Sequence, residues 1–198
     1  MKQVVFNALQ TSLSGGIGRY SYELAKEMYK LDRIDLKIVI REEDKNLFDF
    51  AKQDDLIIAK GIKDSKSRNY YEQLKLPKLI HELYPKAIIH YPDSMAPLLA
   101  KNKVIITIHD LAFKSLKNAF TWKTVLWKSF MTKLSIKKAY KIIAITNFAR
   151  DEVLKHYNIE TDKVDVVYNG FNDFSKEQIE YKNISKKILN LKNKEYIL

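Results

Sequence analysis

Short apolar runs alternate with longer amphipathic stretches along this chain. The apolar runs are short and rich in β-branched residues, so they predict strands at 3–8, 35–40, 55–60, 87–91, 103–109, 141–146 and 163–170. The apolar spacing between them predicts helices at 17–31, 66–84 (interrupted at Pro77), 118–140 and 147–157. Strands that are apolar on both faces are typical of a parallel sheet covered by helices. We therefore predict an α/β fold with a doubly wound, mostly parallel sheet and helices on both faces.

The end of the chain differs from this pattern. Residues 175–190 predict a lysine-rich helix, and the final "EYIL" at 195–198 has the character of a strand beginning. A four-residue strand buries little surface by itself. We expect residues 1–172 to form one domain, and 173–198 to form a linker and the first strand of a truncated second domain.

Composition narrows the class of protein. The chain has 198 residues, 46% of them hydrophobic, no cysteine and a net charge of +11. It has neither a signal-peptide pattern nor an apolar run long enough to cross a membrane, so we expect a globular cytoplasmic protein. The positive charge favours anionic partners, namely phosphorylated ligands, nucleic acid or an anionic membrane surface, although a lysine-rich coding bias would explain it equally well.

Three of the chain's five glycines follow the first predicted strand, at Gly15, Gly16 and Gly18. A helix N-terminus opened by glycine suits a phosphate, and the alternative is a tight turn without a ligand. The loop lacks the P-loop spacing. It is also an incomplete dinucleotide fingerprint, since Ser21 replaces the third glycine. The acids at 42–44 follow the second strand, where a ribose would need a carboxylate, but we favour a solvated loop for them.

His109 and Asp110 follow an apolar strand, and we expect them at the same sheet edge as the glycines. A histidine there can bind a hydroxyl group or act as an acid or base, and Asp110 can orient the loop or bind a hydroxyl. The alternative is a histidine bonded to backbone beside an aspartate that caps a turn. The histidine spacing matches no metal motif, so we expect no metal site.

The helix predicted at 118–140 is basic and aromatic. Residues 114–141 contain eight lysines and no acid, interleaved with Phe120, Trp122, Trp127 and Phe130. We expect the aromatic side chains to lie in the core and the lysines in solvent. The alternative is a helix that lies on an anionic membrane.

Three segments together resemble the N-terminal half of family 4 glycosyltransferases, which have the GT-B fold. These segments are "GGIGRYSYELAKEM" at 15–28, "TIHDLAF" at 107–113 and "AITNFARDEVLKHYNIETDKVDVVYNGF" at 144–171. The resemblance implies a Rossmann-like domain that holds the acceptor, followed by an interdomain hinge at Asn169 and Gly170. Asn172 departs from the family, which often has Asp there.

The resemblance also implies an activity: retaining transfer of a sugar from a nucleotide sugar to a glycan or lipid-linked acceptor, without a metal or cofactor. By this resemblance Gly15, Gly16 and Gly18 approach the donor diphosphate, His109 is catalytic, and Asp110 contacts acceptor or sugar. Arg19 is a second contact to the diphosphate, and the alternative is a helix residue that faces solvent. The C-terminal domain, which holds most of the nucleotide, is not in the sequence, so we expect little activity from this chain alone. We place it in the cytoplasm, at the inner face of the membrane, in polysaccharide or glycolipid assembly.

Two other classes stay open. One is a non-catalytic binding module or subunit that docks with a separate C-terminal half. The other is a dinucleotide-dependent oxidoreductase, which the incomplete fingerprint disfavours. We expect no nucleic-acid partner, because the lysines are not part of a recognisable nucleic-acid motif.

Overall fold

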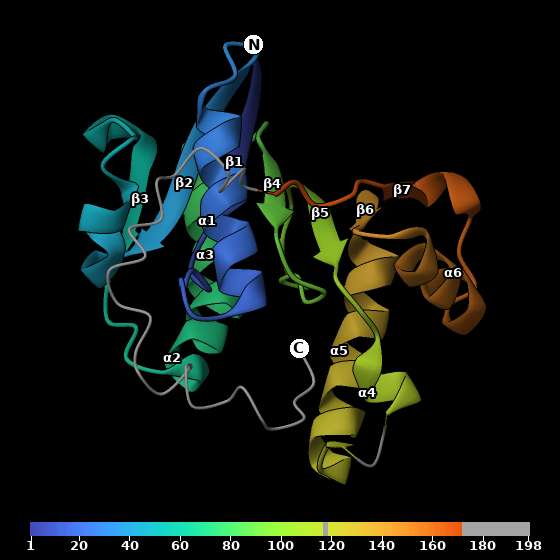
Figure 1. The fold of residues 1–198 in the computed structure, drawn as a ribbon. Helices are drawn as coiled ribbons and strands as arrows, with labels where there is room; N and C mark the ends of the chain where they lie inside the picture. The colour runs from blue at the N-terminus through green and yellow to red at the C-terminus, as the bar shows by residue number, and fades with distance from the viewer. Residues whose placement is uncertain (117–118, 172–198) are drawn as a thin grey trace, which may run out of the picture.

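The strands of the described residues form one parallel sheet of seven strands, in the order β3-β2-β1-β4-β5-β6-β7 (Figure 1). The computed structural model describes residues 1–116 and 119–171. The strands are β1 (Lys2–Asn7), β2 (Ile34–Arg41), β3 (Leu56–Ala59), β4 (Ile88–Tyr91), β5 (Lys103–Ile108), β6 (Lys141–Ala144) and β7 (Val164–Val166). Each lies within a residue or two of a predicted run, except that β7 ends well before residue 170.

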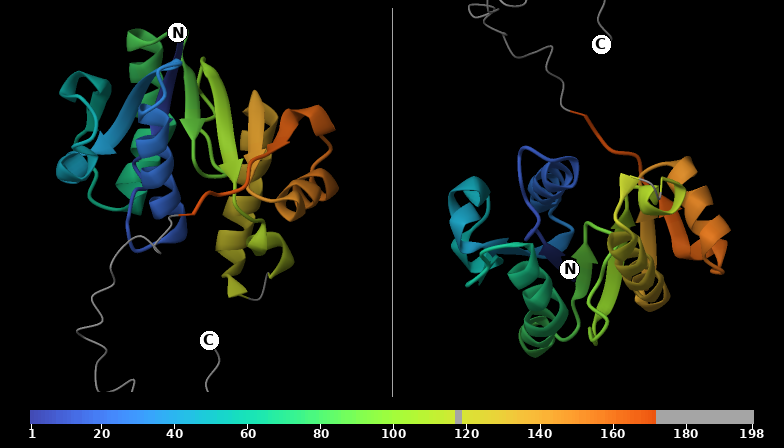
Figure 2. Two further views of the ribbon diagram at one scale, coloured as in Figure 1. Left: turned by 45° about the horizontal axis from the view of Figure 1, so that its top comes forward. Right: turned by 90° about the horizontal axis from the view of Figure 1, so that it is seen from below.

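Helices cover both faces of this sheet. They are α1 (Gly16–Tyr29), α2 (Ser65–Tyr70), α3 (Leu76–Leu83), α4 (Ala112–Ser115), α5 (Trp122–Lys138) and α6 (Asn147–His156). Short 3₁₀ turns lie at η1 (Glu42–Phe48), η2 (Gln53–Asp55) and η5 (Thr161–Lys163). The view along the sheet shows α1 on one face and α3 and α5 on the other (Figure 2). The predicted doubly wound α/β fold is confirmed.

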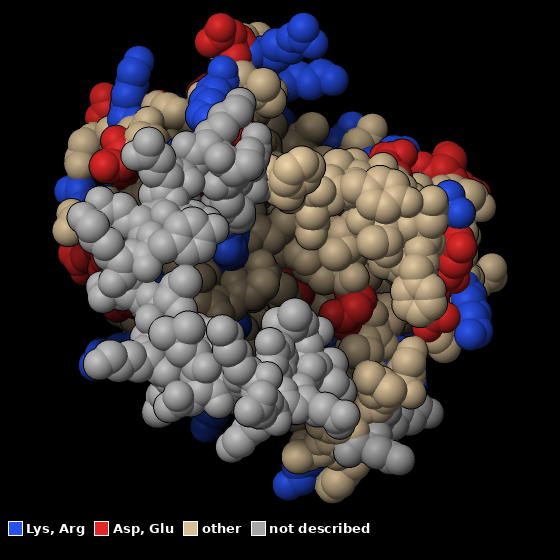
Figure 3. All heavy atoms as spheres, viewed as in Figure 1, with Lys and Arg blue, Asp and Glu red and all other residues tan. Residues whose placement is uncertain are grey.

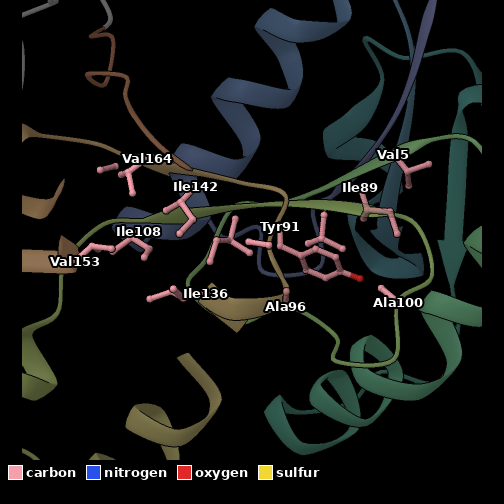
Figure 4. Close-up of a cluster of buried hydrophobic side chains, with 14 of the residues drawn as sticks. Val5, Ile89, Tyr91, Ala96, Ala100, Ile108, Ile136, Ile142, Val153 and Val164 are labelled. Carbon is pink, nitrogen blue, oxygen red and sulfur yellow. The ribbon is translucent and has the colours of Figure 1, made fainter. Parts of the chain in front are cut away.

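The alternation of side chains along each strand divides the core into two clusters. Val5 belongs to the larger cluster, which joins the sheet to α3, α5 and α6 and also contains Ile108 of β5 and Ile142 of β6 (Figure 4). Phe6, the next residue, belongs to the smaller cluster beneath α1. Successive side chains of a strand point to opposite faces, so apolar residues on both faces bury the sheet from both sides.

The segment predicted as one interrupted helix at 66–84 is continuous but irregular. Between α2 and α3 lies a π-helical turn, η3 (Tyr71–Lys75), and Pro77 lies in the first turn of α3. Inside a helical segment proline lacks the N–H that would donate to the preceding turn, and its ring crowds that turn. The irregular turn η3 lies just before Pro77, where both effects act.

The acids at 42–44 lie in η1, and two of the three form ion pairs with a neighbouring arginine. Arg41 pairs with Glu43 at 2.6 Å and with Asp44 at 2.7 Å. The favoured interpretation of a solvated loop is therefore incomplete, because two of these carboxylates neutralise the arginine that ends β2.

The expectation that the aromatic residues of the basic helix lie in the core is wrong. Trp122, Trp127 and Phe130 are exposed, and Phe120 alone among the four packs partly against the core. α5 covers the sheet with its opposite face, where Met131 and Ile136 are buried.

The predicted linker and strand at 173–198, the helix at 175–190 and the departure at Asn172 lie outside the described residues. The proposed domain boundary stays a prediction. Within residues 1–116 and 119–171 no helix has both the length and the apolar character needed to cross a bilayer.

Candidate functional site

The candidate site lies where the loops after β1 and β4 diverge. Connections from β1 lead toward β3, whereas those from β4 lead toward β7, so the sheet changes winding direction between these two strands. Ligands of doubly wound sheets bind at this point, outside the carboxyl ends of the strands. The two loops are joined here, since Gln10 Nε2 donates to Asp93 Oδ2 at 3.0 Å.

The glycines after β1 have two different roles. A Cβ at Gly18 would lie 2.4 Å from the backbone nitrogen of Ser12, so this glycine lets the loop pack against α1. A Cβ at Gly15 or Gly16 would meet nothing within 4 Å. Neither has a positive φ, which among the described residues only Gly61 shows. Packing of the described residues thus explains Gly18, whereas Gly15 and Gly16 leave open space before the helix.

The N-terminus of α1 faces that open space. Gly15 is its N-cap residue, no side chain caps it, and no acid lies in its first turn. Free N–H groups and the helix dipole together make such an end suitable for an anion. Arg19 is exposed one turn further along the helix, and its contact with a diphosphate stays a prediction.

His109 lies just beyond β5 and is held in one orientation. Its Nε2 lies 3.0 Å from the carbonyl oxygen of Pro92, and a carbonyl only accepts, so Nε2 donates this bond. The ring of Tyr20, on α1, meets the imidazole edge to face with 4.7 Å between centroids. When Nε2 carries the only ring proton, Nδ1 is an acceptor, which suits a hydroxyl group.

A buried polar column beneath His109 connects α1 to the sheet. Thr107 Oγ1 lies 2.9 Å from His90 Nε2 and 3.4 Å from the Tyr20 hydroxyl. Burial lowers the pKa of His90 from 6.5 to about 4, so the ring is neutral at pH 7. Burial also raises the pKa of Tyr20. This column positions Tyr20 and therefore His109. The sequence analysis missed it, although a histidine in the strand run 87–91 was a visible signal.

A second buried polar pair lies at the end of β1. Asn7 Nδ2 donates to Glu72 Oε1 at 2.6 Å, and Arg68 Nε lies 3.5 Å from the other carboxylate oxygen. Burial raises the pKa of Glu72 to about 6 despite these partners. The residue belongs to the π-helical turn η3, a feature that sequence spacing does not reveal.

A pocket of about 170 Å³ lies beside this pair, lined by Leu9, Arg41, Ile62, Lys63, Asp64, Ser65 and Arg68. Three of these side chains are cationic and one is acidic, but Arg41 and Arg68 already pair with Asp44 and Glu72. The pocket is therefore suited to a polar ligand that carries hydroxyl groups.

The other predicted residues have ordinary surroundings. Asp110 Oδ1 accepts from the backbone N–H of Ala112 at 2.8 Å, so it caps the turn into α4 while staying exposed. Asn169 and Gly170 are exposed beyond β7, where the chain leaves on the side of the sheet that carries α1 (Figures 1 and 2). Their roles stay predictions. Within the described part of the chain, no three His, Asp or Glu side chains are grouped as a metal site.

Residues 14–173 match the model of Glycosyltransferase Family 4. The chain belongs to this family. The predicted resemblance is therefore confirmed, and it covers both the glycine loop and the His109 segment. A stretch of 76 residues is also 31% identical to the O-antigen chain mannosyltransferase RfbU of Salmonella typhimurium, covering 38% of this family 4 chain and 20% of that protein.

Solved structures share the fold of this family 4 chain. One is a glycosyltransferase of Rickettsia africae, with a TM-score of 0.50 and 23% identity over 86% of this chain and 44% of that one. Another is UDP-GlcNAc 2-epimerase of Neisseria meningitidis bound to UDP-GlcNAc, with a TM-score of 0.55 and 18% identity over 84% of this chain and 46% of that one. This chain spans less than half the length of each of these relatives.

Proposed function

We propose that this family 4 chain is the acceptor-side part of a retaining glycosyltransferase that moves a sugar from a nucleotide sugar to a glycan or lipid-linked acceptor. The observation that carries the proposal is the pairing of an open, uncapped helix N-terminus at Gly15 and Gly16 with an oriented His109 at one switch point. Family membership supports glycosyl transfer in general.

In the proposed reaction the bond from the anomeric carbon to the diphosphate oxygen breaks, and its electron pair leaves with the diphosphate. The acceptor hydroxyl oxygen bonds to the anomeric carbon on the same face, and its proton passes to the departing phosphate oxygen. The N–H groups of the first turn of α1 stabilise the charge that develops on the diphosphate. His109 presents Nδ1 to a hydroxyl of the donor sugar. We place the acceptor in the pocket beside Arg41 and Arg68, and we invoke neither a metal nor an organic cofactor.

We further propose that the described domain does not turn over substrate alone. Transfer needs donor and acceptor held together, and a second domain would supply most contacts to the nucleotide. The O-antigen mannosyltransferase similarity supports a place in polysaccharide assembly. We place the reaction in the cytoplasm at the inner face of the membrane, where lipid-linked acceptors are accessible.

A second candidate is a non-catalytic subunit that docks with a separate C-terminal half. The last described segment favours it, because Val167, Tyr168 and Phe171 expose large apolar side chains there. A stable monomer that gains no transferase activity from any separately expressed C-terminal half would contradict this candidate.

Nuclear magnetic resonance tests the proposed function through the chain's five glycines. On titration with UDP- and GDP-sugars at millimolar concentration, we expect the amide signals of Gly15, Gly16 and Gly18 and the ring of His109 to shift. The amide of Asp32, in the turn before β2 at the opposite edge of the sheet, is the internal control and stays unchanged. A larger shift with a nicotinamide dinucleotide, or no shift with any sugar nucleotide, would overturn the proposal.

A further inference from the structure

α5 exposes a mixed apolar and basic face, which we call the outer face of α5. At 100° per residue its exposed members cover less than half of the helix circumference. Its large apolar side chains are Trp122, Leu126, Trp127 and Phe130, with exposed fractions of 71, 63, 51 and 56%. Exposed lysines on the same face are Lys123, Lys133, Lys137 and Lys138. The opposite face, with Met131, Thr132, Ser135 and Ile136, is buried against the domain.

This face carries charge of one sign only. No Asp or Glu occurs anywhere between residues 114 and 141. Figure 3 shows the start of α5 at the lower end of the molecule in tan and blue. Isolated exposed apolar residues are ordinary, but four on two helical turns, bordered by lysines, form a contiguous patch that suits a partner with apolar depth and negative charge.

The position of this face relates it to the candidate site. Figures 1 and 2 show that α5 begins beyond the carboxyl edge of the sheet, the edge at which the glycine loop and His109 lie. A surface that met the first turns of α5 would therefore lie at the same end of the domain as the site.

We propose that the outer face of α5 docks on an anionic lipid bilayer. The tryptophans, Leu126 and Phe130 enter the boundary between headgroups and acyl chains, and the lysines contact anionic headgroups. This inference rests on the proposed function, which supplies the lipid-linked acceptor. It extends that function by naming the surface that faces the membrane.

The charge of the outer face favours a bilayer over a second copy of the chain as its partner. A symmetric dimer across the outer face would place the lysines of one copy against those of the other, without an acid on that face to pair with them. An anionic bilayer satisfies the apolar and the basic residues together.

The chain carries its own reporter for this surface. Its only two tryptophans, Trp122 and Trp127, both lie on the outer face of α5. We expect a blue shift of intrinsic fluorescence, and quenching by brominated lipid, with vesicles of phosphatidylglycerol and phosphatidylcholine. Phosphatidylcholine vesicles alone are expected to bind far more weakly, and added salt to release the chain.

Two triple variants that remove the same number of positive charges test whether the lysines of the outer face bind the vesicle. Each basic residue near an anionic surface contributes about fivefold to partitioning, so the triple variant Lys123→Gln, Lys133→Gln, Lys137→Gln should bind about a hundredfold more weakly. The control is Lys2→Gln, Lys45→Gln, Lys60→Gln, which removes three exposed charges elsewhere and should bind within about threefold of wild type.

A second pair of variants tests the apolar contribution to vesicle binding while both tryptophans are kept. Leu126→Ser with Phe130→Ser should weaken vesicle binding about tenfold or more. Tyr70→Ser with Leu83→Ser, which are 57% exposed on α2 and α3, is the control and should bind as wild type does. Circular dichroism confirms that each variant is folded.

Four results would overturn the proposal. Two are the absence of a blue shift with anionic vesicles, and equal losses of vesicle binding in the test and control variants. The others are binding to neutral vesicles that the lysine substitutions do not change, and a fluorescence shift that grows with protein concentration in the absence of vesicles. The last would identify a self-interface. The glycine titration, run without vesicles, separates the two proposals. Vesicle binding without glycine shifts sinks the proposed function alone, and glycine shifts without vesicle binding sink this inference alone.

Discussion

α1 and α5 both begin beyond the carboxyl edge of the sheet, on opposite faces, yet their first turns are built differently (Figures 1 and 2). The start of α1 is fitted to its neighbours, because Gly18, Ser21 and Ala25 bring the helix close to the loop and the strands. The start of α5 exposes its largest side chains to solvent. In α1, small residues thus allow a close approach to the sheet, whereas α5 directs its largest side chains away from it.

The largest expected effect comes from adding a single carbon atom to the start of α1. In Gly18→Ala the new Cβ would lie 2.4 Å from Ser12 N and 2.5 Å from Ser12 O, both backbone atoms that cannot rotate away. We expect the free energy of unfolding to fall by about 3 kcal/mol or more, measured by urea denaturation.

Gly16→Ala makes the same chemical change two residues earlier and is the control. Its Cβ meets nothing within 4 Å, and Ala is favoured over Gly in a helix, so stability should stay equal or rise by about 0.5 kcal/mol. Equal losses in the two variants would mean that α1 is not fitted to its loop as described.

The polar column beneath α1 predicts a pH dependence of similar size. The buried His90 has its pKa lowered to about 4 from 6.5, so the unfolded chain binds a proton more readily between these values. Stability that is present above pH 6.5 is therefore lost as the pH falls toward 4, by about 3 kcal/mol. Glu72 opposes this, since its raised pKa of about 6 makes the folded chain the better proton binder between 4.5 and 6.

His90→Gln isolates the histidine contribution from the Glu72 contribution. The difference in free energy of unfolding between wild type and variant should shrink by about 3 kcal/mol from pH 7 to pH 4. A constant difference across this range would show that water reaches His90. The packing between α1 and the sheet would then be looser than its contacts indicate.

The sequence was sufficient for the sheet but not for the packing of single helices. Apolar, β-branched runs located all seven strands, because burial on both faces leaves a signal in each run. The side of α5 that faces the core left no such signal. Its buried face mixes Met131 and Ile136 with Thr132 and Ser135, whereas its exposed face carries the tryptophans, so both faces look alike in an apolar count.

The candidate site was predictable in outline only. Gly15 and His109 were found because each directly follows a strand or its turn, and topology brings those ends to one edge. The contacts that orient His109, from Tyr20 and Pro92, depend on register and loop geometry between segments far apart in the chain. Nor could spacing separate Gly18, which the packing requires, from Gly15 and Gly16, which the packing leaves open.

The smallest expected effect concerns the outer face of α5. Trp122→Ala with Trp127→Ala removes two large side chains, yet both are more than half exposed and alanine favours helix, so the free energy of unfolding should change by less than about 0.5 kcal/mol. Ile136→Ala, on the buried face of the same helix, should lower it by about 3 kcal/mol. Circular dichroism during urea denaturation measures both without tryptophan fluorescence. A loss from the tryptophan pair as large as that from Ile136 would show that these rings stabilise the domain itself. A near-zero change would show that these side chains have no role in folding, which agrees with the proposed contact between the outer face of α5 and a bilayer.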